Sequence, residues 1–217
     1  MKTTIIFITL LILGTSTFAQ EDKYTEIMKE NLLLMDSAKD SNDWLQIANT
    51  MERIAETENS KWLPSYYASL SFMLTGIMSE KKKDQEEYYE KALNHILKCE
   101  TIVGIDSSEA LVLKAQIWQM QISLKPMKLG RTLGPQAEIA IKEAMRIDPE
   151  NPRAYLLRGQ TLYYTPEAFG GDKVKACEDF NSAKERFEAF EPETEISPKW
   201  GLDINNDMLE FCEEFSE

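Results

Sequence analysis

Apolar side chains recur three and four positions apart from about residue 22 to the end of the chain, and no segment alternates as a strand does. One helical pattern occurs three times: a small residue, a bulky residue four positions later, and a small residue three positions after that. Its members are Ala92, Ile96 and Cys99, then Ala137, Ile141 and Ala144, then Ala176, Phe180 and Ala183. The first members lie 45 and 39 residues apart. This packing signature predicts an all-α solenoid of helix-turn-helix repeats, in which each helix pair buries its apolar face against the next.

Capping residues mark several ends of the expected helices. Asn151 and Pro152 indicate a helix start with proline in the first turn, and Asp172 is expected to cap the third signature helix. Gly134 and Pro135 are expected to start the second signature helix.

No Gly/Ser-rich linker or low-complexity stretch divides the chain, so we expect a single domain over residues 20–217. It should comprise a degenerate N-terminal helix pair over 22–56, three helix pairs over 60–192 and a capping helix over 203–215. Caps are needed because the end units of a solenoid would otherwise expose their apolar sides.

Two segments that precede signature helices share a second pattern. It comprises Tyr155, Gly159 and Leu162, and again Leu111, Ala115 and Trp118, at the spacing W-x2-L-G-x2-Y. Arg158 and Lys114 stand where that pattern has leucine. With these motifs the chain resembles the tetratricopeptide repeat family over roughly residues 40–192, in particular its exported bacterial members. The resemblance implies a helical-repeat scaffold that binds a protein or peptide in a concave groove.

The same resemblance implies which side chains line that groove, since the first helix of each pair faces the concave side. The candidates are Trp62, Phe72, Met73, Val112, Gln116, Gln119, Met120, Arg153, Leu156, Gln160, Tyr163 and Tyr164. Aromatic, methionine and glutamine side chains suit an adaptable site for a peptide or an apolar ligand. A register shifted by one position would instead place several of them in the core, and the sequence leaves that alternative open.

The extra length of these repeats lies between the two helices of a pair, and insertions on one edge of a solenoid often belong to its binding side. One such segment, residues 125–135, carries Lys125, Lys128 and Arg131 and no acidic residue. This basic loop is a candidate for binding an acidic partner, a carboxylate or the chain's own acidic C-terminal part. The alternative is a solvated loop with no dedicated partner.

The second such segment, residues 165–172, ends in Phe169, Gly170, Gly171 and Asp172. The glycines permit a sharp turn with Phe169 tucked beneath it, or they leave backbone N–H groups for an anion. The segment resembles the Phe-Gly-Gly-Asp turn of periplasmic tetratricopeptide proteins, including the T-component of TRAP transporters. That resemblance implies an alternative function, a small-molecule-binding accessory protein of a periplasmic transport system. The lipid-anchor cysteine of the usual T-component is missing here.

Residues 1–19 have the features of a secretory signal peptide. Lys2 precedes the apolar run Ile5–Leu13, and Thr17 and Ala19 are the small residues of a cleavage site. The run is too short to span the ~30 Å hydrocarbon core of a bilayer. We therefore expect the mature chain to be periplasmic or secreted, with no stable membrane anchor.

The chain is acidic, with a net charge of −13, and residues 178–217 hold thirteen acids against three bases. Most of this charge is expected to lie on a solvated face that aids solubility. Because an acidic surface repels phosphate backbones, nucleic acid is not an expected partner.

Three cysteines and the single histidine, His95, are the few groups suited to metal or nucleophilic chemistry. Cys99 belongs to the packing signature, so we expect it in the core. Cys177 and Cys212 would pair if the C-terminal helix folds back on the last repeat, which the sequence leaves open. No CxxC, triad spacing, phosphate-binding loop or dinucleotide motif occurs. We therefore expect no metal, no cofactor and no enzymatic activity, and predict an exported scaffold for protein–protein or protein–peptide interaction.

Overall fold

A computed structural model describes residues 23–102 and 105–212. Within them every regular element is a helix, and no strand occurs. The signal peptide expected over residues 1–19 and the end of the expected capping helix, from residue 213, lie outside the described residues. No helix of the described part is both long and apolar enough to cross a membrane.

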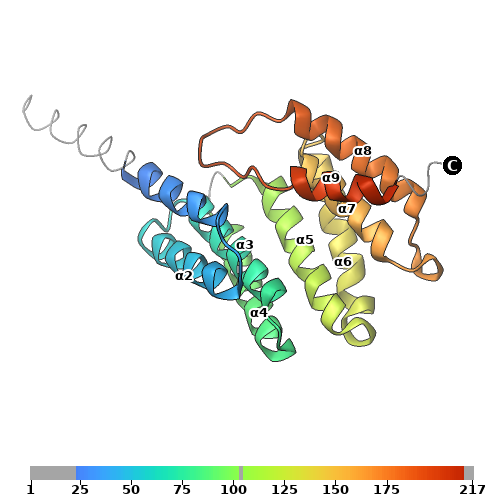
Figure 1. Cartoon of the computed structure of the whole chain (residues 1–217), viewed down its shortest axis with the longest axis horizontal. Helices are drawn as coiled ribbons and strands as arrows, with labels where there is room; N and C mark the ends of the chain where they lie inside the picture. Colours follow the sequence, from blue (N-terminus) through green and yellow to red (C-terminus); the bar gives the residue numbers. More distant parts are fainter. Residues whose placement is uncertain (1–22, 103–104, 213–217) are drawn as a thin grey trace, which may run out of the picture.

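The helices follow one another along a single stack (Figure 1). They are a helix over residues 23–35, α2 (Ser41–Thr57), α3 (Trp62–Met78), α4 (Lys82–Cys99), α5 (Ser107–Leu124), α6 (Pro126–Ile147), α7 (Pro152–Tyr164), the short 3-10 helix η1 (Glu167–Phe169), α8 (Lys173–Ala189) and α9 (Leu202–Cys212). Helices adjacent in the chain pack against each other, most extensively α2 with α3, α3 with α4, α5 with α6, and α7 with α8. The fold is therefore an all-α helical-repeat solenoid, as the sequence predicts.

Two predicted caps start their helices as expected. The side chain of Asn151 accepts a hydrogen bond from the Arg153 N–H at 3.0 Å, and Pro152 follows in the first turn of α7. Asp172 accepts from the Lys175 N–H at 3.0 Å at the start of α8. These bonds satisfy N–H groups that have no partner inside the helix.

The packing signature lies in the interior, where each of its members is at most 2% exposed. Two glycines in the partner helices permit the same close approach. A Cβ added at Gly76 in α3 would lie 2.5 Å from the Tyr89 ring, and one at Gly159 in α7 would lie 2.5 Å from the Phe180 ring. Small residues thus bring the two helices of a pair together, and the bulky residues fill the space between them.

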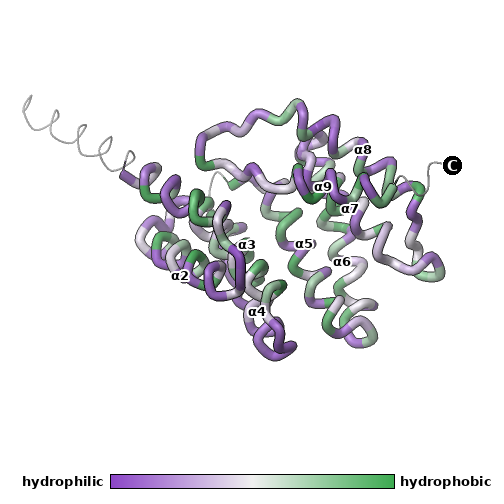
Figure 2. Tube along the Cα trace, viewed as in Figure 1, coloured by the Kyte–Doolittle hydropathy of each residue, from purple (hydrophilic) through white to green (hydrophobic). Residues whose placement is uncertain are grey.

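α5 lies in the middle of the stack and packs on α4, α6 and α7. Figure 2 shows hydrophobic residues along most of its length, whereas hydrophilic and hydrophobic residues alternate along α8. A helix that is apolar on several sides needs neighbours on several sides. α5 therefore joins the N-terminal and C-terminal halves of the solenoid.

The basic loop expected over residues 125–135 is not a loop. α6 begins at Pro126, and Gly134 and Pro135 lie inside it, so the expected start at these two residues is wrong. Proline suits the first turn of a helix because its missing N–H would have no partner there. The extra length of this repeat is therefore a longer helix.

A segment without regular structure, residues 190–201, connects α8 to α9, and we call it the strap. Figure 1 shows it leaving the end of α8, reaching toward the N-terminal helices and returning to α9. Cys177 of α8 and Cys212 of α9 form a disulfide. The C-terminal helix thus folds back on the last helix pair, which settles the pairing that the sequence left open.

Candidate ligand-binding site

A buried polar network lies where the first helices of the three pairs begin. The Nε of Arg153 in α7 donates to Glu109 Oε1 in α5 at 2.8 Å, and the Tyr66 hydroxyl in α3 donates to Glu109 Oε2 at 2.9 Å. The Nε1 of Trp200 in the strap donates to the Tyr66 hydroxyl at 2.9 Å. Burial raises the pKa of Tyr66 well above its usual value, so the hydroxyl keeps the proton that it donates.

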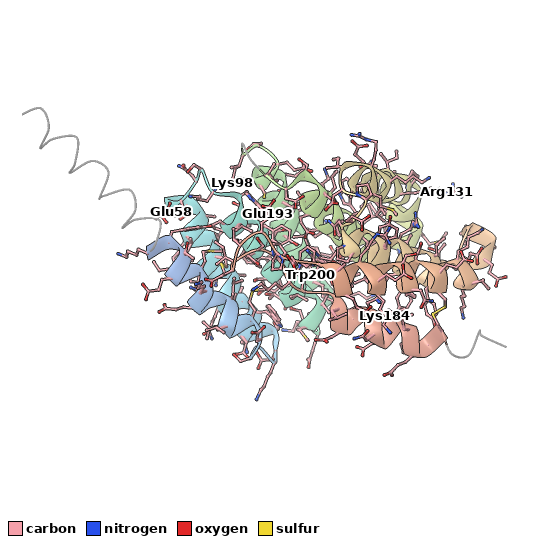
Figure 3. All side chains as sticks on the ribbon, turned by 90° about the horizontal axis from the view of Figure 1, so that it is seen from above. Glu58, Lys98, Arg131, Lys184, Glu193 and Trp200 are labelled. Carbon is pink, nitrogen blue, oxygen red and sulfur yellow. A yellow bond between two sulfur atoms is a disulfide. The ribbon has the colours of Figure 1, made fainter. Side chains whose placement is uncertain are left out.

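The strap is bound to the first helices through its backbone as well. Arg153 donates from Nη1 to the Trp200 carbonyl at 3.1 Å and from Nη2 to the Pro198 carbonyl at 3.2 Å. The Tyr67 hydroxyl donates to the Ile196 carbonyl at 2.9 Å. Figure 3 shows Trp200 near the centre of the molecule. The chain therefore covers part of its own expected groove with the strap.

Several candidates for the expected groove are core residues instead. The buried ones are Phe72, Met73, Val112, Arg153 and Leu156. The prediction that they line an open groove is wrong, because their positions face neighbouring helices or the strap. For these five residues the alternative that the sequence left open, a position in the core, is the one observed.

The other groove candidates keep some solvent access. Trp62, Gln116, Gln119, Met120, Gln160 and Tyr163 are half-buried, and Tyr164 is exposed. The Nε2 of Gln119 donates to Thr161 Oγ1 at 2.5 Å, which links α5 to α7. A binding role for these residues remains a prediction.

The exposed aromatic side chains of the described residues gather at one end of the solenoid. Tyr164 ends α7, Phe169 lies in η1 and Phe211 lies in α9, and they are 67%, 82% and 50% exposed. The ring of Tyr163 contacts two of them, with its centroid 5.2 Å from that of Tyr164 and 6.3 Å from that of Phe211. We call Tyr163, Tyr164, Phe169 and Phe211 the aromatic patch. Figure 1 shows the end of α7, the start of α8 and the end of α9 together on this side.

The turn between α7 and α8 carries Phe169. The N–H of Asp172 donates to the Leu162 carbonyl at 3.1 Å, so the turn folds back on α7. Gly170 has a φ of 95°, and a Cβ at Gly171 would overlap the backbone oxygen at the end of α7, so both positions require glycine. Phe169 points into solvent and is not tucked beneath the turn as expected. In other respects the segment is the sharp turn that the sequence predicts. The Asp172 side chain accepts a hydrogen bond from the Lys175 N–H at the start of α8.

Positive charge adjoins the patch. The Nζ of Lys173 lies 5.3 Å from the centroid of the Tyr163 ring, and Lys175 forms an ion pair with Asp172 at 3.0 Å. Backbone and side-chain hydrogen bonds from Lys175 lower the pKa of Asp172, which keeps it ionised. A shallow hollow beside them is lined by Glu167, Gly171, Asp172, Lys173 and Val174.

The basic residues around the start of α6 are partly neutralised within the chain. Lys125 pairs with Glu86 of α4, and Lys114 pairs with Glu100. Lys128 and Arg131 are exposed on α6. The partner of Lys125 is thus an acid of α4 and not the acidic C-terminal part.

His95 and Cys99 belong to the structure of the first repeats. His95 Nε2 lies 3.1 Å from Glu52 Oε1, and the ring stacks on Phe72 with centroids 5.4 Å apart. Desolvation lowers the pKa of His95 against the opposing effect of Glu52, and burial raises the pKa of the Cys99 thiol to about 12. Among the described residues no group of His, Cys, Asp and Glu side chains could hold a metal ion.

No protein-family model matches the sequence, and no curated protein matches it. Among solved structures, the chain is similar to the HusA haemophore from Porphyromonas gingivalis. The two share 26% sequence identity with a TM-score of 0.80, over 89% of this chain and 94% of that chain. The likeness covers the whole arrangement of helices and not one repeat alone. It agrees with a non-enzymatic binding role and leaves the tetratricopeptide assignment a prediction.

Sequence reasoning missed two features of this region. The buried partners Tyr66 and Glu109 were not singled out, because an acid in the first turn of a helix is common and does not by itself indicate burial. Phe211 was assigned only to the capping helix. Its place in the aromatic patch depends on the fold of the strap, which has no periodic pattern to predict it.

Proposed function

We propose that this chain is an exported, non-enzymatic binding protein whose ligand is haem or a closely related porphyrin. The observation that carries the proposal is the likeness to a haemophore, which extends over nearly the full length of both chains. The proposal follows the second of the two functions predicted from the sequence, binding of a small molecule, without its assignment to a transport system.

Two features of the chain favour a compact apolar ligand over an extended peptide. The strap covers the first helices of the pairs through Arg153 and Tyr67, on the face where a scaffold would bind a peptide. Exposed aromatic rings are instead concentrated at the end of α7. Ligands with extended ring systems gain from such surfaces by stacking and by removal of apolar area from water.

Titration of the purified mature chain, residues 20–217, with haemin tests the proposal. We expect a saturable change in the Soret absorbance with a defined stoichiometry, and a saturable change in the fluorescence of metal-free protoporphyrin IX if the ring system is what binds. The same chain unfolded in denaturant is the control. A response that grows linearly with haemin, as free haemin does, would reject the function.

Export is part of the proposal. The Cys177–Cys212 disulfide supports it, because such bonds persist in oxidising compartments. N-terminal sequencing of the protein from cell fractions tests it. A chain beginning at Gln20 outside the cytoplasm is the expected result, and an intact Met1 in the cytoplasmic fraction would contradict it.

A further inference from the structure

We propose that the porphyrin binds on the aromatic patch, with its face stacked on Tyr164, its rim against Phe211 and one carboxylate beside Lys173. The inference rests on the proposed function and assigns a site to it. It places recognition at the last helix pair and α9, not in the expected concave groove.

The exposure of these rings is the first argument. Within the described part of the chain, every aromatic side chain outside Tyr164, Phe169 and Phe211 is buried or half-buried. Val174, in the first turn of α8, adds another exposed apolar side chain at this end. A cluster of apolar side chains on the surface of a soluble domain marks a place where something binds.

The arrangement of the rings is the second argument. Tyr163 is half-buried, with its ring tilted against Phe180 at 6.5 Å and against Phe211 at 6.3 Å. Tyr164 stands at 81° to Tyr163 with centroids 5.2 Å apart. The inner ring thus contacts both outer rings, whose planes differ by at least 42°, the difference between 81° and 39°. A flat ligand can therefore stack on one outer ring while its rim meets the other. Pre-arranged rings need little ordering when such a ligand binds.

Charge distinguishes this end from the rest of the C-terminal region. Residues 178–217 carry a net charge of −10, whereas the first turn of α8 carries Lys173 and Lys175. These lysines add to the positive end of the α8 helix dipole. The Nζ of Lys173 lies against the Tyr163 ring, so its positive charge is close to where the carboxylates of a porphyrin on the patch would lie.

The Tyr164 hydroxyl is directed to Met208 Sδ at 3.5 Å. Because the hydroxyl is directed to Met208, the ring face of Tyr164 is the part that can contact a ligand. Phenylalanine at this position should keep the site, and alanine should remove it.

The disulfide holds the site together. Cys212 follows Phe211 directly and is joined to Cys177 of α8, which fixes the end of α9 beside α7 and α8. Reduction of this bond frees the last turn of α9 and the ring of Phe211 with it.

The experiment compares haemin affinities of the oxidised mature chain and of exposed-residue variants whose fold is confirmed by circular dichroism. We expect Tyr164→Ala to weaken binding about tenfold, as loss of a stacked ring does, and Phe211→Ala to weaken it several-fold through loss of the contact with the rim. Lys173→Gln should weaken it several-fold, and reduction of the disulfide should weaken it in the wild-type chain. Tyr164→Phe should remain within about twofold of the wild type. Met127→Ala on α6, where the side chain is 92% exposed, is the matched control for loss of an exposed apolar group.

The outcomes separate the site from the function. If the wild type binds haemin and the alanine variants bind as tightly, the site is wrong and the proposed function stands. If Tyr164→Phe loses binding as fully as Tyr164→Ala, recognition depends on the hydroxyl and the stacking site is overturned. If the wild type does not bind haemin or protoporphyrin IX, the function and the site both fall.

Discussion

Arg153 and Glu109 form a buried ion pair, with the guanidinium Nε 2.8 Å from the carboxylate and side chains that are 1% and 5% exposed. Burial raises the pKa of Glu109, while the adjacent Arg153 acts in the opposite direction and favours the carboxylate. The pair lies between α5 and α7, and its arginine also binds the strap. One side chain therefore connects two helix pairs with the segment that covers them.

Replacing Arg153 by methionine should lower the free energy of unfolding by about 3–5 kcal/mol, because Glu109 is then buried without its partner. The double variant Arg153→Met with Glu109→Leu should recover part of that loss. Urea unfolding followed by circular dichroism measures both. Arg146→Met, which removes the exposed partner of Glu143, is the control and should change little. A loss for Arg153→Met no larger than that of the control would mean that the pair does not stabilise the stack.

The glycines of the helix pairs should not tolerate alanine. Gly76→Ala and Gly159→Ala place a Cβ 2.5 Å from the rings of Tyr89 and Phe180, and overpacking of this kind costs about 1–3 kcal/mol. Gly130→Ala lies within α6, where the contact of the added Cβ beyond its own backbone and chain neighbours is Ile122 Cγ2 at 4.0 Å, so it should stabilise the chain by about 0.5–1 kcal/mol. Midpoints of thermal unfolding for the three variants test the contrast. Equal shifts for all three would show that the close approach of the helices is not what the glycines provide.

His95 should make the chain less stable as the pH falls. Its pKa in the folded chain lies below the ordinary value of 6.5, chiefly because of desolvation, so the unfolded chain takes up the proton first. The neutral His95 side chain therefore contributes to the free energy of unfolding above about pH 6.5, and this contribution is lost as the pH falls toward the pKa of His95 in the folded chain. The free energy of unfolding of the wild type, relative to His95→Gln, should therefore decrease between pH 7.5 and pH 5.5. An unchanged or increasing difference would contradict the assignment.

Thiol counts test the cysteine arrangement. We expect no reaction of the native chain with a thiol reagent at pH 8, because Cys99 is buried and its pKa is raised to about 12. Unfolding without a reductant should expose one thiol, and unfolding with subsequent reduction should expose three. Replacing Cys177 and Cys212 by serine should lower the free energy of unfolding by about 3–4 kcal/mol, as expected for a loop of this length. Three thiols in the unreduced unfolded chain would show that the disulfide is absent.

The repeat architecture could be predicted because the packing signature is local and periodic, and residues such as Ala92 and Phe180 lie buried where it places them. Helix starts could be predicted from capping chemistry at Asn151 and Asp172. The start of α6 could not be predicted in the same way, since Gly134 and Pro135 look like a local start and only packing over the whole helix overrides them. The sequence therefore predicts helices better than it predicts where they begin.

The candidate site was less predictable because it depends on contacts between distant residues. Tyr66 meets Glu109 across 43 residues and Trp200 across 134. The strap has no periodicity that would reveal its path, so the sequence could not show that it covers part of the groove. Tyr163 and Tyr164 were identified as candidates, but their neighbour Phe211 comes from α9, which only the fold brings beside them.

The disulfide also determines the fate of the chain after a cut in its backbone. The strap, which carries the exposed acids Glu191, Glu193 and Glu195, lies within the 35-residue interval between Cys177 and Cys212. A protease that cleaves there leaves two fragments joined covalently, and α9 stays attached to α8. A nicked chain would run as one band without reductant and as two with it. In any compartment that contains proteases, a cut in the strap therefore leaves α9 attached to the rest of the chain.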